Sequence, residues 1–309
     1  MSTKEEKTEE ETTVEAVADA KKKKEDSEEL TKRLQKLALE RQKQMSGDRL
    51  KVIQSNSDSH LTGAKTFQEL NLPKHLLDAI FAMGFDRPSA IQEEALPRIL
   101  ADPPRNLIGQ AQSGSGKTAA FTLGMLYRIE VDDPPTCQAL CVTPSRELAI
   151  QIFDKAVKPM AANMQGLKIQ LAIAGTSVER GVGLNAHICI GTPGKIVDWL
   201  KRKIIKTNTI KVFVLDEADN MVGEGGHRAN SLLIKKMMPK TCQSLLFSAT
   251  FPEDVVKFAD KMINNPDKIL IERGPEYLVS LFTSGFGLVS DVLLPNLIIN
   301  LFFLRRSWT

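Results

Sequence analysis

The stretch AQSGSGKT at residues 111–118 decides the fold. It follows a short apolar run at residues 106–108 that we expect to be a strand, and it opens a segment of helical length. Glycines in such a loop let backbone N–H groups close around phosphates at the positive end of the next helix. We expect Lys117 to reach the β- and γ-phosphate oxygens and the Thr118 hydroxyl to coordinate magnesium. Ala111 stands in place of the usual first glycine, but the flanking strand and helix supply the context that chance matches lack.

Two carboxylates end another apolar run further along the chain. Residues 211–215 are followed by Asp216, Glu217, Ala218 and Asp219. Ligands of open α/β sheets bind at the carboxyl ends of strands, so this placement suits a reaction on the bound phosphates. We expect Asp216 to hold magnesium, directly or through water, and Glu217 to polarise the water that attacks the γ-phosphate.

The pattern over residues 63–272 predicts an α/β fold, because short apolar runs alternate with amphipathic stretches of helical length. Such a pattern is typical of a parallel sheet covered by helices. We predict strands at residues 106–108, 139–142, 169–173, 187–190, 212–215, 244–247 and 269–271. Ser248, Ala249 and Thr250 close one of these runs, and alone they carry little information.

Composition limits the functional classes. The chain has 309 residues, 42% of them hydrophobic, and a net charge of +3, which permits nucleic acid binding but excludes a histone-like electrostatic binder. The four cysteines lack CxxC spacing and a histidine cluster, so we expect buried, reduced thiols in an intracellular protein. The first residues contain no apolar core of a signal peptide.

The two ends of the chain differ from its middle. We expect residues 1–62 to be a disordered charged arm with a helix over residues 27–45, either transient or serving as a docking or self-inhibitory element. Residues 273–309 form an atypical apolar tail. The tail is long enough to span a bilayer, but Pro295, Asn296 and Asn300 favour an alternative chain end over a membrane anchor.

Together these motifs resemble the DEAD-box ATP-dependent RNA helicase family, over the whole of its first RecA-like P-loop domain. The segment GFDRPSAIQ at residues 84–92 is similar to the family's Q motif. The resemblance implies that Gln92 reads the adenine edge, that Phe67 packs on the base, and that ATP is preferred to GTP. The expected cofactor-binding residues are Phe67, Arg87, Gln92, Gln112, Ser113, Gly114, Ser115, Gly116, Lys117, Thr118 and Asp216. The expected catalytic residues are Lys117, Asp216 and Glu217, and the magnesium ligands are Thr118 and Asp216.

The resemblance also implies an RNA site. Its residues are Pro144, Arg146, Gly175, Thr192, Pro193 and Gly194. They would hold the sugar-phosphate backbone of single-stranded RNA without reading sequence, and such binding depends on salt. Here Ser145 replaces the commoner threonine, and Ala174 with Gly175 replaces a double glycine. Ser248 and Thr250 would couple the nucleotide site to strand separation through Asp219.

Residues 101–108 and 211–219 look most like the nuclear-pore mRNA-export branch of the family, with translation-initiation helicases as the alternative. This branch implies nuclear-pore and mRNA-export factors as partners and a location in cytoplasm and nucleus. We also expect a monomer. DEAD-box enzymes close two RecA-like domains around ATP, and we find no counterpart of the second domain after residue 272. We therefore expect weak binding of ATP and RNA with little turnover, or a non-catalytic module that competes for helicase partners.

Overall fold

The computed structural model describes residues 49–55, 61–179, 183–223 and 227–272. The predicted helix over residues 27–45 and the apolar tail at residues 273–309 lie outside the described residues, as does most of the predicted charged arm. All described residues belong to one compact unit. No helix in this described part is long and apolar enough to cross a membrane.

The described residues form one eight-stranded sheet with the strand order β1-β8-β2-β7-β6-β3-β5-β4. The strands are β1 Arg49–Ile53, β2 Leu107–Gln110, β3 Ala139–Val142, β4 Ile169–Ala172, β5 Ile188–Gly191, β6 Val212–Leu215, β7 Gln243–Ser248 and β8 Asp267–Glu272. The seven strands from β2 to β8 run parallel, and all seven were predicted from the sequence. Their near-continuous apolar runs are those of strands buried on both faces.

Strand β1 corrects the predicted extent of the charged arm. Its residues lie within the span expected to be disordered, yet they pair antiparallel with β8, and Leu50 and Val52 stand opposite Ile271 and Ile269. Leu50 packs against the core. The local signal is weak because two apolar positions alternate with basic residues over only five positions. Pairing with a distant strand, rather than local propensity, makes this segment a strand.

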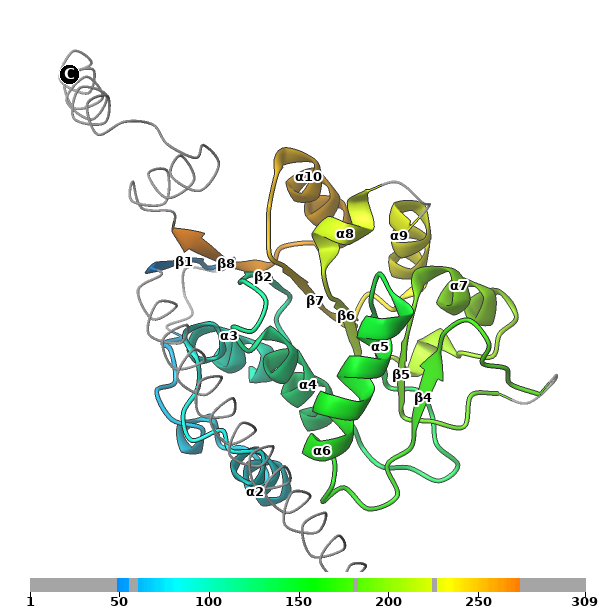
Figure 1. Cartoon of the computed structure of the whole chain (residues 1–309), viewed down its shortest axis with the longest axis horizontal. Coiled ribbons are helices and arrows are strands. Elements are labelled where there is room, and N and C mark those ends of the chain that lie inside the picture. Colours follow the sequence, from blue (N-terminus) through cyan, green and yellow to red (C-terminus); the bar gives the residue numbers. More distant parts are fainter. Residues whose placement is uncertain (1–48, 56–60, 180–182, 224–226, 273–309) are drawn as a thin grey trace, which may run out of the picture. The chain divides into compact units, whose positions relative to one another are not determined.

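Helices cover both faces of the sheet, which makes a three-layer α/β/α arrangement (Figure 1). The α-helices are α2 Lys74–Ala82, α3 Ala90–Leu100, α4 Lys117–Tyr127, α5 Arg146–Ile152, α6 Lys158–Met160, α7 Pro193–Lys201, α8 Ala218–Val222, α9 His227–Met237 and α10 Glu253–Met262. Three short helices, η1 Gln68–Leu70, η2 Phe153–Val157 and η3 Thr207–Thr209, complete the described elements. Helices α2 to α6 share one core with one face of the sheet, and α7 to α10 share a second core with the other.

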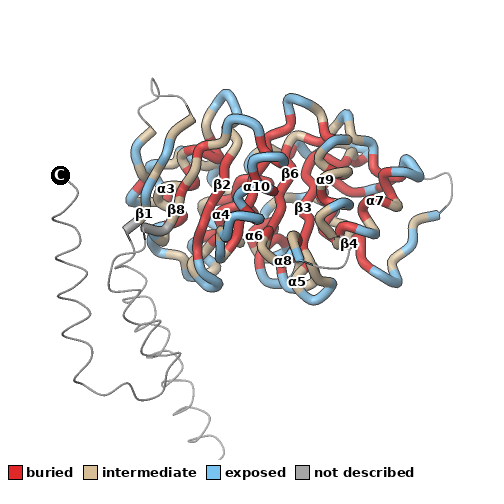
Figure 2. The backbone as a smooth tube through the Cα atoms, turned by 90° about the horizontal axis from the view of Figure 1, so that it is seen from above, coloured by how far each residue is buried: buried red, intermediate tan, exposed pale blue. Residues whose placement is uncertain are grey.

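Successive side chains along each strand point alternately into these two cores. In β6, Val212 and Val214 pack on the side of α2 to α6, whereas Phe213 and Leu215 pack on the side of α7 to α10. The central strands are buried along their length (Figure 2). All four cysteines are buried free thiols, as predicted. Burial raises the pKa of Cys137 and of Cys242 to about 12, so these thiols are protonated at neutral pH.

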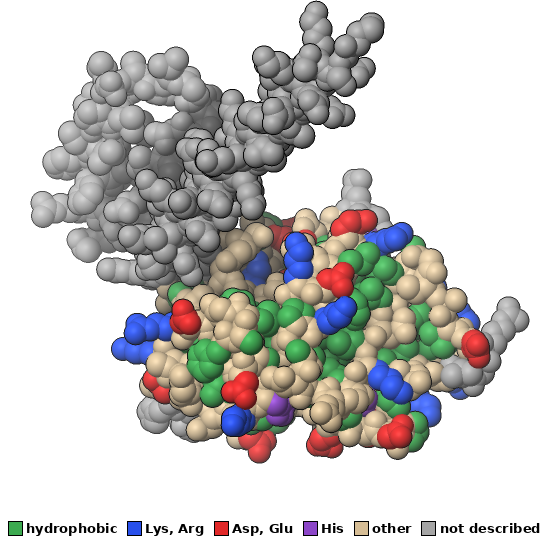
Figure 3. Space-filling view, turned by 60° about the horizontal axis from the view of Figure 1, so that its bottom comes forward, with side chains coloured by type: hydrophobic (Ala, Val, Ile, Leu, Met, Phe, Trp, Pro, Cys, Tyr) green, Lys and Arg blue, Asp and Glu red, His purple; other side chains and the backbone are tan. Residues whose placement is uncertain are grey.

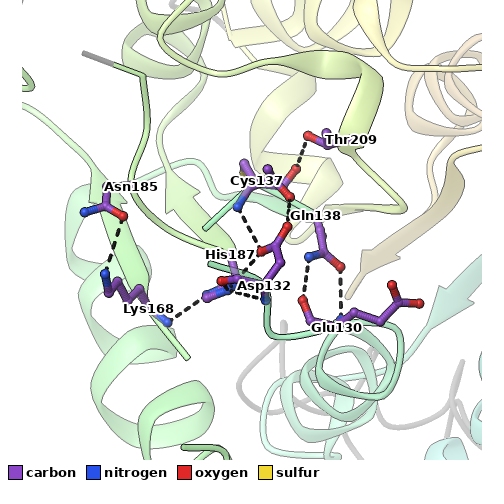
Figure 4. A network of polar contacts seen from close by, with 9 residues as sticks. Glu130, Asp132, Cys137, Gln138, Lys168, Asn185, His187 and Thr209 are labelled. Carbon is purple, nitrogen blue, oxygen red and sulfur yellow. Dashed lines mark hydrogen bonds and ion pairs between the residues drawn. The ribbon is translucent and has the colours of Figure 1, made fainter. Parts of the chain in front are cut away.

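A buried histidine holds together the amino-terminal edge of the sheet, where β4 and β5 begin (Figure 4). His187 is 0% exposed. The backbone N–H groups of Lys168 and Asp132 lie 3.0 and 3.2 Å from its Nδ1 and its Nε2, respectively. The Nε2 nitrogen also lies 3.1 Å from a carboxylate oxygen of Asp132. Hydrogen bonds from Thr136 hold the pKa of Asp132 below its usual value, so the carboxylate is the acceptor in this network.

We expect His187→Ala to lower the free energy of unfolding by about 1–3 kcal/mol, because the N–H of Lys168 loses its acceptor and a cavity remains at a fully buried side chain. Chemical denaturation of the purified chain would measure the change. His75→Ala is the matched control, since His75 is only half-buried and its side chain is not part of this network. Equal midpoints for the two variants would contradict a structural role for the network.

Candidate functional site

The phosphate loop joins the end of β2 to the start of α4. Gly114 and Gly116 have φ of +82° and +101°, a left-handed conformation that favours glycine. A Cβ at Gly114 would meet no heavy atom within 4 Å, so the loop is open on that side. The N–H of Ala111 donates to the carbonyl of Ser248 at 3.1 Å, which fixes the loop's first residue to the end of β7. Gln112 and Ser113 in the same loop are exposed.

Lys117 lies inside this loop rather than on the surface, with 7% of its area exposed. Its ammonium donates to the carbonyl of Ala111. Burial lowers the pKa of Lys117, and three nearby carboxylates, of which Asp216 acts most strongly, offset only part of that shift. Thr118 follows in the first turn of α4 and is half-buried. The loop thus presents a cation and a hydroxyl where the sequence predicted them.

The carboxylates of residues 216–219 lie at the carboxyl end of β6. Asp216 is 3% exposed, and its N–H donates to the carbonyl of Val142 at 3.0 Å. Burial raises the pKa of Asp216 to about 6, although the charge of Lys117 acts against the shift. A buried carboxylate with a raised pKa beside one lysine suits a cation as further partner.

Glu217 has φ of +52°, an uncommon conformation for a residue with a side chain, and it turns the chain from β6 into α8. The side-chain amide of Asn220 donates to Oε2 of Glu217 at 3.0 Å. This partner was not foreseen, and the only sequence signal for it is a polar residue three positions after Glu217.

Asp219 binds the segment that follows β7. Its carboxylate accepts hydrogen bonds from the N–H and the hydroxyl of Thr250, at 3.1 and 2.8 Å, and its own N–H donates to Oγ of Ser248 at 3.1 Å. Burial raises the pKa of Asp219, but the hydrogen bonds from Thr250 and Ser248 outweigh it, so the pKa lies below its usual value. The predicted contact of Asp219 with these two residues is therefore present, and its coupling role stays a prediction.

Ser89 and Gln92 brace the phosphate loop from behind. Ser89 caps α3 and donates through Oγ to the carbonyl of Ser115 at 2.6 Å. Gln92, 3% exposed, accepts from the N–H of Ser89 at 2.9 Å and donates to the carbonyl of Gly116 at 3.0 Å. A serine followed three residues later by glutamine is a capping-box signal, which could have revealed that Ser89 caps α3. Reading of adenine by Gln92 stays a prediction.

Two residues of the predicted nucleotide site lie apart from this polar cluster. Phe67 is 3% exposed and packs in the core, edge-on to Phe81 with ring centroids 6.5 Å apart. Its expected packing against a base therefore remains a prediction. Arg87 is exposed in the turn before α3.

The predicted RNA residues follow β3, β4 and β5. Pro144 leads from β3 to Ser145, whose hydroxyl caps α5 by accepting from the N–H of Leu148 at 3.1 Å, so serine serves here in place of threonine. Arg146 is exposed in the first turn of α5. After β4, Gly175 has φ of +90° in an exposed turn.

A third loop of this group follows β5. Thr192 precedes α7, Pro193 is buried as its first residue, and Gly194 is exposed. The N–H of Thr192 donates to the carbonyl of Ala172 at 3.1 Å, which joins this loop to the end of β4.

Strand order places the predicted nucleotide loops next to the predicted RNA loops. Because β2 to β8 are parallel, their carboxyl ends lie at one edge, where the loops after β2, β7 and β6 adjoin those after β3, β5 and β4. The hydrogen bond from Asp216 to Val142 crosses the border between the groups. On the face shown in Figure 3, acidic and basic side chains are interspersed, as the small net charge leads one to expect.

The donor set of this site fits magnesium bound together with phosphates. Among the described residues, no group of three or more His, Cys, Asp or Glu side chains could hold a metal by itself. Mg²⁺ commonly takes one or two protein ligands and completes its shell with phosphate oxygens and water. Thr118 and Asp216 as its two protein ligands stay a prediction.

Comparison with known proteins agrees with this geometry. The chain is 48% identical over 233 residues to the ATP-dependent RNA helicase DDX19A of Homo sapiens, across 75% of this chain and 48% of the relative. It is 44% identical over 225 residues to the ATP-dependent RNA helicase DBP5 of Meyerozyma guilliermondii, across 73% of this chain and 46% of the relative. The chain thus spans about half the length of the curated relatives it matches.

Solved structures show the same fold. A structure of Saccharomyces cerevisiae Dbp5 bound to RNA and ADP BeF3 matches with a TM-score of 0.63 and 43% identity, over 69% of this chain and 53% of that one. A DEAD box protein from Methanococcus jannaschii matches with a TM-score of 0.60 and 33% identity, over 67% of this chain and 56% of that one. The family model described as DEAD/DEAH box helicase matches residues 89–258, more than half of the 309 residues. The chain therefore belongs to the DEAD/DEAH box helicase family.

Proposed function

We propose that the protein is an RNA-stimulated ATPase that uses ATP and Mg²⁺ to remodel RNA–protein complexes. The observation that carries the proposal is the hydrogen-bonded cluster that joins the phosphate loop, the carboxylates of residues 216–219 and the end of β7, beside three loops with exposed backbone and an arginine. Relatives named as ATP-dependent RNA helicases support it.

Each residue of the cluster has a role in this proposal. The N–H groups of the loop and Lys117 hold the phosphates, while Thr118 and Asp216 hold the metal, which would neutralise charge on the phosphates when bound. Glu217, fixed by Asn220, orients and polarises the attacking water. Asp219, Ser248 and Thr250 would transmit the state of the nucleotide to the RNA loops, because the same segment touches Ala111 of the phosphate loop.

The RNA partner is a single strand held by its backbone. Arg146 and the exposed backbone of Gly175 and Gly194 suit phosphate and sugar contacts, which carry no sequence information. We therefore propose binding that tolerates any sequence and weakens with salt.

The matched solved structures suggest where in the cell the protein acts. Structures of S. cerevisiae Dbp5 include complexes with gle1 and ip6, with nup159, and with RNA and ADP BeF3. On this likeness we propose a role in mRNA export at the nuclear pore, with such factors as partners and a distribution between cytoplasm and nucleus. The identity to DDX19A and DBP5 favours this branch over the translation-initiation branch.

For the 309 residues alone we propose binding of ATP and RNA with little turnover. The relatives are about twice as long, and in phosphoryl transfer an arginine supplied from elsewhere is worth about 10³–10⁵ in rate. A non-catalytic module that competes for helicase partners is the second candidate function. The two differ in whether a second RecA-like domain added in trans restores hydrolysis.

Glu217→Gln should reduce single-turnover hydrolysis of ATP by about 100-fold or more, because a positioned general base contributes about 10²–10⁴. ATP affinity should change little, since Glu217 does not belong to the phosphate loop. Quench-flow hydrolysis and fluorescent nucleotide titration would separate the two effects. A matching loss of affinity would instead assign Glu217 to binding.

Arg146→Ala should weaken binding to single-stranded RNA by a similar factor for different sequences and reduce the slope of log K against log salt by about 1. Fluorescence anisotropy at several salt concentrations would measure both. Arg202→Ala is the control, because Arg202 is exposed at the opposite end of α7 from Gly194. An unchanged slope for Arg146→Ala would remove this residue from the RNA site.

Purified chain with saturating single-stranded RNA should bind ATP but hydrolyse it at no more than about one thousandth of the rate expected of a complete enzyme. Adding a second RecA-like domain in trans should raise turnover, and Glu217→Gln should abolish the gain. Robust turnover of the chain alone, lost in Glu217→Gln, would overturn the low-turnover proposal and point to arginines donated by a second copy.

A further inference from the structure

A groove of about 590 Å³ lies between α10 and the end of the sheet formed by β1, β8 and β2. Helix α3 packs against the other face of β1 and β8. Apolar side chains line the groove, among them Ile108 from β2, Leu270 from β8 and Val256 from α10. None of the residues proposed to hold nucleotide phosphates lines it.

The groove leaves apolar surface in contact with solvent. Val256 is 38% exposed although neighbouring positions of α10, such as Val255 and Phe258, are buried. Ile53 is 42% exposed, and by strand alternation it lies on the same face of β1 as Lys51, which lines the groove. Exposed apolar surface within a cavity commonly marks a binding site.

We propose that residues 277–290 of this same chain occupy the groove. Strand β8, which forms its floor, ends at Glu272, so the segment YLVSLFTSGFGLVS follows only four residues later. The intervening sequence contains Gly274 and Pro275, a pair typical of chain reversals. The segment carries no charge and has eight apolar residues in fourteen, which matches a groove with apolar walls.

Charge at the rim supports the same occupant. Lys268 pairs with Asp260 across the groove at 3.1 Å. Lys51 lines the groove with an exposed side chain and makes no ion pair within the described part of the chain. Glu276 is the only acidic residue between positions 273 and 290, and it stands immediately before the apolar segment. An ion pair between Glu276 and Lys51 would anchor the segment at the groove.

Covalent connection favours this segment over a separate partner. A short link to β8 gives an effective concentration in the mM range, so even weak apolar contacts would keep the groove filled. Thr250 and Phe251 also line the groove, and Thr250 binds Asp219. The docked segment would therefore contact the residues that follow β7. This inference concerns an intramolecular surface and holds whether or not the proposed ATPase activity is found.

Cysteine cross-linking in the full 309-residue chain tests the proposal. Because all four native cysteines are buried, introduced surface cysteines react selectively. The pair Val256→Cys and Leu281→Cys should form an intramolecular cross-link with a short bismaleimide at least about tenfold faster than the control pair, as expected for docking next to a tether. The control pair is Val131→Cys and Leu281→Cys, since Val131 is 45% exposed in the loop before β3.

Three results would overturn the inference. Equal rates for the two pairs would show that the segment does not dock. Covalent dimers in place of intramolecular products would show that a second copy fills the groove. Co-sedimentation of the chain with phosphatidylcholine vesicles, together with loss of the cross-link, would assign the segment to a membrane.

A second measurement does not depend on introduced cysteines. Chymotrypsin cuts after aromatic residues, and the segment contains Tyr277, Phe282 and Phe286. Val256→Glu should speed cleavage there by at least about tenfold, whereas Val131→Glu should leave it unchanged, since opening a docked segment exposes its sites. Both positions are exposed, so neither variant disturbs the core. Equal cleavage of the two variants would contradict docking.

Discussion

Parallel pairing of the strands is the constraint on which the site depends. Seven strands pointing in one direction deliver the loops that follow β2 to β7 to a single edge, although those loops are far apart in the sequence. Hydrogen bonds between loops, such as that from Ala111 to Ser248, then set their relative positions. The loops after β2, β7 and β6 adjoin those after β3, β5 and β4 because β6 and β3 are direct neighbours in the sheet.

Burial shapes the electrostatics of this edge. Lys117 and Asp216 are both almost fully enclosed, and removal from water disfavours the charged form of each. The opposite charges of Lys117 and Asp216 offset only part of this cost. A ligand that brings phosphates and a divalent cation would give Lys117 an anionic partner and Asp216 a cationic one. Asp219 differs, since its charge is already satisfied by Thr250 and Ser248, and it holds structure together rather than awaiting a ligand.

Sequence reasoning succeeded where a motif coincides with the end of a buried strand. The loop before Lys117, the carboxylates after β6 and all seven parallel strands were predicted because apolar runs of this length are hard to bury in any other way. It failed where the structure depends on distant pairing. The five residues of β1 are too few to show the alternation of apolar and polar residues that predicts a strand. The contacts of Ser89 with the phosphate loop form only when α3 packs behind that loop.

The antiparallel ladder between β1 and β8 has a mechanical consequence. Arg49 stands opposite Glu272, so the chain enters β1 and leaves β8 at the same end of the ladder. A force that draws these two points apart would open the ladder one hydrogen-bonded pair at a time, like a zipper, instead of loading all pairs together. Sequences attached before residue 49 and after residue 272 can therefore peel the edge strand away at low tension while the parallel strands, loaded through β2, stay closed.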